Sequence, residues 1–444
     1  MRKRLLAIAM CLTLAAVSLA GCSKTNKENA TSNSAATSEP TKEAADSKGG
    51  ETKSTGDKIT ITVTKWGEVT ENDVETKLIE EFNKTNDKNI EVKLDVVPGD
   101  GYGDRLTTSF SSGEGYDIFL SGEGDFYKWV DKGLASNLDD LIKSDSTFTN
   151  NMTESIYNMG NINGGQYYLI KDYNPMCLWY NKDMFDAAKI EYPNENWTWD
   201  DLYAAAQKLT TKNDDGTFNT FGFQAQSWAY AVSCYLESKG LSYLSPDGKT
   251  ADGYFNSPDM AKALDWYFGM AEGDNRVSPT TADTDTYGDG TSMMISGKLG
   301  MFISGGWVKA SLNDAGTNYG TALIPGNHTS YICASGYTLG SRCKNPEAAW
   351  EVLKLLTGEK ASELRTKNEA VLPTSKTQMD SLAATFTDDQ KALLKTLDYG
   401  VQPVGLRGAL GSKINEILTN TFDRIVFKDG KTQDILNEEL KNIK

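Results

Sequence analysis

Alternating apolar and polar residues recur along the chain, and stretches with helical spacing separate them. Residues 58–65 alternate and predict a strand that ends at Trp66. A capping-box pattern at 70–73 predicts the start of a helix. Residues 90–97 predict a second strand, and 116–120 a short buried one. Strands that alternate with helices are typical of βαβ units, so we expect an α/β fold with a mostly parallel sheet.

The same pattern starts again further along the chain. Residues 167–179 predict a long extended stretch, interrupted at Asn174, where the chain could cross between two lobes. Residues 198–201 predict a capped helix, and 299–304 predict a buried strand. The chain from about Ser375 onward reads as helical. About 390 residues follow residue 57, more than one hydrophobic core usually organises, so we expect two lobes.

The N-terminal region predicts an exported protein. Arg2, Lys3 and Arg4 precede an apolar run that is short for a membrane span and leads into Leu-Ala-Gly-Cys at 19–22. We expect residues 1–21 to be a lipoprotein signal peptide and Cys22 to carry a lipid anchor. An ordinary secretory signal, with Cys22 present by chance, is the alternative. We expect no second membrane span.

Residues 22–57 are predicted to be a flexible linker. From 23 to 57 the sequence contains no aromatic residue and no Ile, Leu, Val or Met. Such a segment cannot bury enough apolar surface to offset the entropy lost on ordering. We therefore expect a body tethered to the outer face of the cell membrane, outside the cytoplasm, of a Gram-positive bacterium.

The charge and the residue usage limit the possible ligands. The formal net charge is −16, and removal of the three basic residues at the start lowers it to about −19. Such a body repels nucleic acid and anionic lipid, which favours a neutral or cationic small ligand. One histidine, His328, leaves little for zinc or acid–base chemistry, so we expect no metal and no cofactor.

Four cysteines remain beyond Cys22: Cys177, Cys234, Cys333 and Cys343. They show no CxxC spacing and are sparse for an exported chain, so we expect buried free thiols rather than a disulfide scaffold. A Cys333–Cys343 pair across a hairpin is left open.

Ligands in open α/β sheets bind beyond the carboxyl ends of the strands. This rule selects three segments that follow predicted strands and precede predicted helices: 66–68, 121–125 and 305–307. A sugar offers an apolar face to an aromatic ring and hydroxyls to carboxylates and amides. Tryptophans and acids at these ends predict a site for a neutral carbohydrate. The alternative is that the tryptophans belong to the core and the acids cap helices. The candidates are Trp66, Glu68, Ser121, Glu123, Asp125, Gly306 and Trp307.

Four segments, at 180–183, 198–202, 305–307 and 344–350, also resemble a known family in order and spacing. The chain is similar to the family 1 extracellular solute-binding proteins of carbohydrate ABC transporters, which include maltose- and oligosaccharide-binding proteins. The resemblance implies an α/β, two-lobed periplasmic-binding-protein-like fold of type II, with a hinge of several crossing segments. It implies lobes at 58–172 with 331–371 and at 173–330 with 372–444.

The resemblance further implies a non-enzymatic, monomeric protein that captures a neutral mono- or oligosaccharide and delivers it to ABC permease subunits. Matching positions add Asn174, Gln226, Trp228, Tyr230 and Arg407 to the expected ligand site, and Trp307 matches a stacking tryptophan. Asp172 and Tyr337 complete the candidate set.

Three other functions stay open at the level of sequence. A cationic peptide or polyamine would suit the acidic charge. A secreted glycoside hydrolase would use two carboxylates on either side of a glycosidic bond. A ligand-sensing partner of a membrane receptor would use the same lobes as a transport protein.

Overall fold

The computed structural model describes residues 58–67, 73–99, 101–368 and 371–443. The predicted signal peptide, Cys22, the linker and Glu68 therefore lie outside the described residues. Within the described part, no helix combines the length and the apolar character that crossing a bilayer requires.

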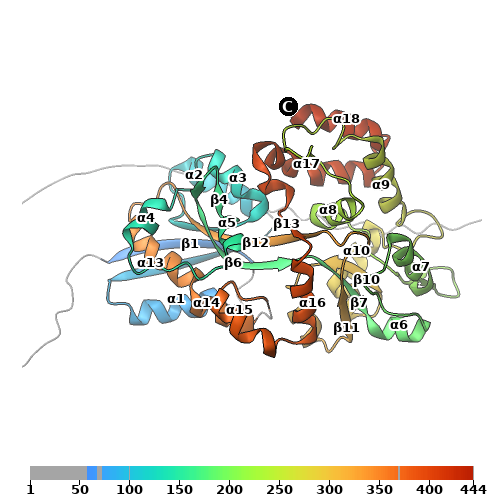
Figure 1. Ribbon diagram of the computed structural model, residues 1–444, viewed down its shortest axis with the longest axis horizontal. Coiled ribbons are helices and arrows are strands. Elements are labelled where there is room, and N and C mark those ends of the chain that lie inside the picture. Colours follow the sequence, from blue (N-terminus) through green and yellow to red (C-terminus); the bar gives the residue numbers. More distant parts are fainter. Residues whose placement is uncertain (1–57, 68–72, 100, 369–370, 444) are drawn as a thin grey trace, which may run out of the picture. The chain divides into compact units, whose positions relative to one another are not determined.

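The larger of the two main sheets has six strands, in the order β13-β12-β3-β1-β2, with β6 also paired to β12. β1 pairs in parallel with β2 and β3, whereas β12 runs antiparallel to both β3 and β6. Figure 1 shows β6 running from this sheet toward the second one. The strands are β1 (Ile59–Trp66), β2 (Ile90–Val97), β3 (Ile118–Gly122), β6 (Tyr168–Pro175), β12 (Ser330–Leu339) and β13 (Gly400–Val401).

The second main sheet has three strands in the order β10-β7-β11. β10 (Met301–Ser304) and β11 (Tyr319–Ala322) are both antiparallel to β7 (Cys177–Asn181). Only Met176 separates β6 from β7, so the chain passes from one sheet into the other near Asn174.

The expectation of a mostly parallel sheet is wrong: β1–β2, β1–β3 and β12–β13 are parallel pairs, whereas the pairs of β12 with β3 and β6 and both pairs of β7 are antiparallel. The alternation of strands and helices predicts how elements that are adjacent in sequence connect. It does not predict the direction of β7 and β12, which pair with strands from distant parts of the chain. β7 lies between β10 and β11, which α12 (Val308–Asp314) connects. An inserted strand can run in either direction, and here it runs against its neighbours.

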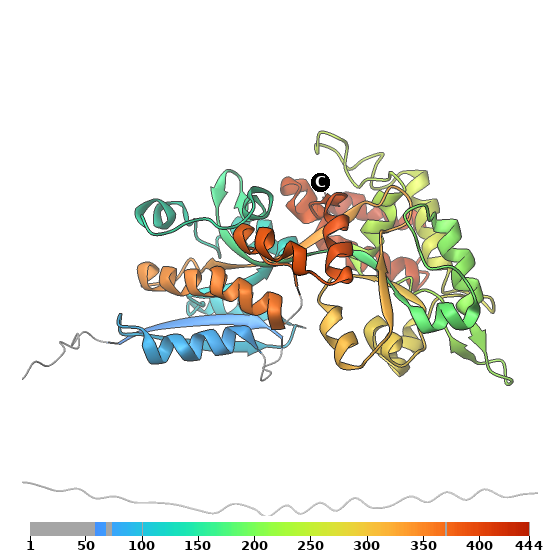
Figure 2. The same cartoon turned by 60° about the horizontal axis from the view of Figure 1, so that its bottom comes forward.

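Side chains on each sheet alternate between two cores, as the pleat of a strand requires. Ile118 and Leu120 of β3 face a core that includes Trp350, whereas Phe119 faces a core that includes Trp129. Figure 2 shows α1 (Val74–Thr85) and α13 (Pro346–Thr357) running along the first sheet. Both faces are covered, which explains the nearly continuous apolar sequence of β3.

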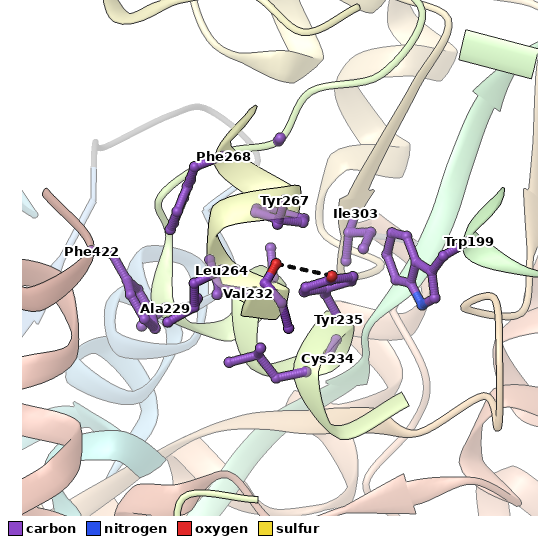
Figure 3. Close-up of a cluster of buried hydrophobic side chains, with 14 of the residues drawn as sticks. Trp199, Ala229, Val232, Cys234, Tyr235, Leu264, Tyr267, Phe268, Ile303 and Phe422 are labelled. Atoms are coloured by element: carbon purple, nitrogen blue, oxygen red, sulfur yellow. Dashed lines mark hydrogen bonds between the residues drawn. The ribbon is translucent and has the colours of Figure 1, made fainter. Parts of the chain in front are cut away.

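The second sheet has the same arrangement. Leu178 and Ile303 face a large core around α8 (Ala229–Ser238). In this core Tyr235 stacks on Tyr267, with ring centroids 4.7 Å apart, and its hydroxyl donates a 3.0 Å hydrogen bond to the Ala263 carbonyl (Figure 3). Because this core holds α8 firmly, it also fixes the residues at the N-terminal end of that helix.

The remaining elements complete the described chain. They are α2 (Tyr102–Ser112), α3 (Glu123–Asp131), α4 (Asp139–Ser144), α5 (Glu154–Asn158), β4 (Asn161–Ile162), β5 (Gly165–Gln166), α6 (Lys182–Ala188), α7 (Trp199–Leu209), β8 (Thr211–Lys212), β9 (Phe218–Thr220), α9 (Pro258–Gly269), α10 (Thr281–Tyr287), α11 (Gly290–Ile295), α14 (Glu359–Asn368), α15 (Lys376–Leu382), η1 (Ala383–Thr385), α16 (Asp388–Leu397), η2 (Val404–Leu406), α17 (Gly408–Val426) and α18 (Thr432–Ile443).

Several local predictions can be compared with these bounds. The Thr198 capping box is present, with Asp201 as its second member. Residues 70–72 of the predicted capping box lie outside the described residues; the helix that follows begins at Val74, with Asp73 as the N-cap whose carboxylate accepts the Thr76 N–H. None of the four described cysteines forms a disulfide bond, and the pair left open between Cys333 and Cys343 is absent; three of the four are buried and Cys343 is half-buried.

Candidate ligand-binding site

A groove of about 710 Å³ lies beside the end of β10. It brings together three of the predicted site residues, Gln226, Trp228 and Trp307. The groove is lined by Gln226, Trp228, Asp289, Gly290, Thr291, Ser292, Ile295, Phe302, Ser304, Trp307, Val308 and Ser311. We call these residues the aromatic groove.

Two exposed indole rings dominate the aromatic groove. Trp228 is 37% exposed and Trp307 is 41% exposed, and their ring centroids lie 5.9 Å apart at an interplanar angle of 74°. Trp228 in turn lies against Tyr230, with centroids 5.3 Å apart. Large exposed rings that meet edge to face offer two flat apolar faces to a ligand.

Local packing fixes both sides of this aromatic pair. The indole of Trp307 folds back over Gly305. A Cβ atom added to Gly305 would lie 2.1 Å from the indole, so the ring occupies the space that a side chain at 305 would need. Trp228 is the N-cap residue of α8, which the core of Figure 3 holds in place. Gln226 donates from Nε2 to the Ile303 carbonyl at 2.7 Å, which ties the segment before α8 to β10. The rings are therefore presented by a rigid frame.

The crossing strand reaches the loop that carries Trp307. Asn174 is 4% exposed, and its amide oxygen accepts no hydrogen bond from any described residue. This oxygen lies against Gly306. A Cβ atom added to Gly306 would be only 2.4 Å from it. The structure thus brings two candidates, Asn174 and Gly306, together beside the aromatic groove.

Glu123 lies at the start of α3, where the sequence had predicted a loop. It is 3% exposed, and its Oε2 accepts the Ala334 N–H at 2.8 Å. Burial raises the pKa of Glu123 to about 7, and the nearby Asp172 carboxylate adds to the rise. The hydroxyl of Tyr230 faces this carboxyl group and lies against Gly124. Glu123 and Tyr230 are thus brought together as well.

Two other acidic candidates are already paired within the protein. Asp172 contacts Lys171 at 2.5 Å and accepts a 2.6 Å hydrogen bond from the Ser335 hydroxyl. Asp125 pairs with Lys128 at 3.2 Å. Within the described ranges, no three His, Cys, Asp or Glu side chains gather as a group that could hold a metal ion.

Four candidates take positions that the sequence did not anticipate. Arg407 forms a two-pronged ion pair with Glu237, both contacts at 2.9 Å, so its charge is already engaged. Tyr337 is fully buried in the core of the first sheet. Trp66 packs edge-on against Tyr102 at 5.5 Å. Ser121 is buried and donates to the Gly122 carbonyl at 3.2 Å. None of these four lines the aromatic groove.

Sequence reasoning missed the polar side of the aromatic groove. Asp289 and Ser292 were not among the candidates; in the structure Asp289 is the N-cap of α11 and accepts the Ser292 N–H at 2.8 Å. The sequence contains one signal for this groove wall. Three successive apolar residues, Met293, Met294 and Ile295, cannot all lie on one buried face of a short helix, so one of them should be exposed. Ile295 is 40% exposed and lines the groove.

Comparison with known proteins agrees with this architecture. The model of the bacterial extracellular solute-binding protein family matches residues 66–363. A protein of Brucella abortus (strain 2308), designated a binding protein, is 28% identical over 295 residues, which span 65% of this chain and 69% of the relative. A galactooligosaccharide-binding protein of Bacillus subtilis (strain 168) is 25% identical over 249 residues, which span 51% of this chain and 53% of the relative.

A solved structure has the same fold. The ABC substrate-binding protein of Listeria monocytogenes, in complex with cycloalternan, is 24% identical and has a TM-score of 0.75, with 87% of this chain and 98% of that chain covered. This likeness confirms the expected α/β binding-protein fold, and the matched family is one of solute-binding proteins rather than enzymes. The chain belongs to the bacterial extracellular solute-binding protein family.

Proposed function

We propose that the protein binds a neutral sugar or oligosaccharide in the aromatic groove and delivers it to an ABC permease. The observation that carries the proposal is the exposed pair Trp228 and Trp307 next to the amide and hydroxyl groups of Gln226, Ser304 and Ser311. Apolar sugar faces stack on indole rings, while sugar hydroxyls need such polar partners. The relative named for galactooligosaccharides supports this ligand class.

The state of the acidic candidates favours a neutral ligand over a peptide cation or polyamine. Asp172 and Asp125 are each paired with a lysine, and the raised pKa of Glu123 lowers its charge near neutral pH. A polyamine would need free carboxylates to replace its lost hydration.

A hydrolase is disfavoured on different grounds. It needs two carboxyl groups across the scissile bond, about 5–9.5 Å apart. Among the described residues that line the aromatic groove, Asp289 alone carries a carboxylate, and it caps α11.

Membrane attachment and closure belong to the same proposal. We infer that Cys22 anchors the chain through the linker 22–57, and that the monomer works at the outer face of a Gram-positive membrane. We further infer that the lobes 58–172 with 331–371 and 173–330 with 372–444 close around the ligand. The passage from β6 to β7 next to Asn174 supports a hinge at this point.

Thermal unfolding of residues 58–444 with a panel of neutral saccharides tests the ligand class. A saccharide at 100 times its dissociation constant stabilises by about 2.7 kcal/mol. With an unfolding entropy of about 2.1 cal/mol/K per residue, a body of this size should gain about 3 °C. A shift with spermidine or cationic peptides, and with no saccharide, would refute the proposal. Product analysis after incubation with a binding saccharide tests the hydrolase alternative.

A further inference from the structure

The contact between the two expected lobes contains a buried carboxyl group. Glu123 begins α3 in the lobe 58–172 with 331–371, whereas Tyr230, which faces it, lies in α8 of the other lobe. Oε2 of Glu123 accepts the Ala334 N–H, but its Oε1 has no hydrogen-bond partner among the described residues. A negative charge at this position would lack part of the solvation that water gives it, so burial favours the protonated carboxyl group.

The backbone beside Glu123 is packed closely against the other lobe. The Asn415 side chain of α17 donates from Nδ2 to the Gly124 carbonyl at 3.1 Å. A Cβ atom added to Gly405 of η2 would lie 2.8 Å from the same carbonyl, and one added to Gly124 would lie 2.4 Å from the Tyr230 hydroxyl. α3 thus packs tightly against η2 and α17 (Figure 1). Because Glu123 is only 3% exposed, water reaches its carboxyl group only when this contact opens.

The groups around this contact do not compensate a negative charge on Glu123. The titratable and charged groups that face Glu123 or Tyr230 are the Cys333 thiol of β12, Asp172 of β6 with its partner Lys171, and Asp125 of α3 with its partner Lys128. Both lysines are engaged by these aspartates, and η2 and α17 contribute the uncharged Gly405 and Asn415. Burial and the Asp172 charge raise the pKa of Glu123 from its ordinary value of 4.5 to about 7.

We propose that Glu123 is a proton-dependent latch between the two lobes. With a proton on its carboxyl group, the side chain stays buried, and α3 stays packed against Tyr230, η2 and α17. Loss of this proton to solvent leaves a negative charge next to Asp172, and the contact opens so that water solvates the carboxylate. This inference rests on the lobe division of the proposed function but not on the identity of the ligand.

Tyr230 connects the latch to the aromatic groove. Its ring centroid lies 5.3 Å from that of Trp228, and the Trp228 centroid lies 5.9 Å from that of Trp307. Opening of the contact at Glu123 therefore acts on the segment that presents both indole rings. A ligand that prefers one arrangement of the lobes will take up or release a proton when it binds, because the two equilibria are linked.

The test measures the distance between the lobes without any ligand. Spin labels are attached at Ser112→Cys and Lys262→Cys, two exposed positions on α2 and α9, in a chain from residue 23 onward that carries Cys343→Ser. Double electron–electron resonance gives the populations of the packed and the open arrangement from pH 5.5 to 8.5. If Glu123 titrates near pH 7 when packed and near pH 4.5 when open, the ratio of packed to open protein should fall about 30-fold over this range.

Two variants separate Glu123 from the other carboxyl groups of the chain. Glu123→Gln keeps an acceptor for the Ala334 N–H but has no proton to lose, so it should stay packed at every pH. Asp131→Asn is the matched control, because it removes an exposed carboxylate from the other end of α3, and it should follow the wild type.

A wild-type distance that does not change with pH would overturn the latch, and so would an equal change in Glu123→Gln. The proposed function would stand in both cases. Failure of every saccharide to stabilise the wild type in thermal unfolding would instead refute the proposed ligand class, while a pH-dependent distance would still support the latch.

Discussion

Replacing Trp307 by alanine tests whether this ring binds the ligand. The ring is 41% exposed, and a tryptophan side chain presents up to about 250 Å², so about 100 Å² of apolar surface is available to a ligand. At about 25 cal/mol per Å², covering this area contributes about 2.5 kcal/mol, or about a 70-fold change in the dissociation constant. We therefore expect Trp307→Ala to weaken saccharide binding by one to two orders of magnitude.

The cost of the same change to folding should be of comparable size, because the buried part of the ring, about 150 Å², contributes about 3.7 kcal/mol at the same coefficient. The edge-on contact with Trp228 adds about 0.5–1.5 kcal/mol. Titration calorimetry measures the loss of affinity, and denaturant unfolding without ligand measures the loss of stability. Affinity retained by the folded variant would show that the ring serves only the core, and it would refute this reasoning.

Gly305→Ala offers a second perturbation of the same ring. The new methyl group would lie 2.1 Å from the indole, so the ring must move while all its atoms remain. We expect weaker binding with little change in stability. Unchanged affinity in this variant would mean that the position of the indole does not matter to the ligand.

Three further predictions concern other parts of the chain. Because burial raises the pKa of Glu123 to about 7, the folded state binds more protons than the unfolded state between about pH 4.5 and 7. Stability should therefore fall by about 3 kcal/mol as pH rises through this range, and Glu123→Gln should remove that slope in unfolding experiments at several pH values; parallel slopes would contradict it. Glu237→Ala should cost about 3 kcal/mol in denaturant unfolding, because it leaves Arg407 and the Tyr331 hydroxyl without their shared partner; a loss below 1 kcal/mol would argue against this role. Cys22→Ala should move the protein from the membrane fraction to the medium in cell fractionation, and retention in the membrane would contradict lipid anchoring.

Local patterns predicted single elements well, because their causes lie within a few residues. The alternation at 58–65 gave β1, and residues 90–97 are β2 with the same bounds. The capping box at Thr198 depends only on Asp201, three residues later. Strand direction was harder, since β7 and β12 insert between strands from distant parts of the chain.

The candidate site shows the same division. The strand-end rule and the family resemblance selected Gln226, Trp228 and Trp307, and the structure places all three around one groove. Arg407 was a candidate because of its place in the chain, but the partner that engages its charge, Glu237, lies 170 residues away. An ion pair between residues so far apart cannot be predicted from the spacing of residues in a single sequence. Tyr337 lies in β12, and the residue pattern of that strand does not show that both faces of the sheet are covered. Its burial in the core could therefore not be predicted.

Contacts between the two sheets link the candidate site to the proposed closure. Asn174 belongs to β6 of the first sheet, yet its amide oxygen lies against Gly306, next to the stacking ring of Trp307. Glu123 begins a helix that follows β3 of the first sheet, and its carboxyl group faces Tyr230 of α8. If the lobes move relative to each other, these contacts must change at the same time as the rings are covered or exposed. A ligand shifts such an equilibrium only by its difference in affinity for the two states. The buried amide oxygen of Asn174, which has no partner among the described residues, is therefore well placed to favour one state, because a ligand hydroxyl could bond to it in only one of them.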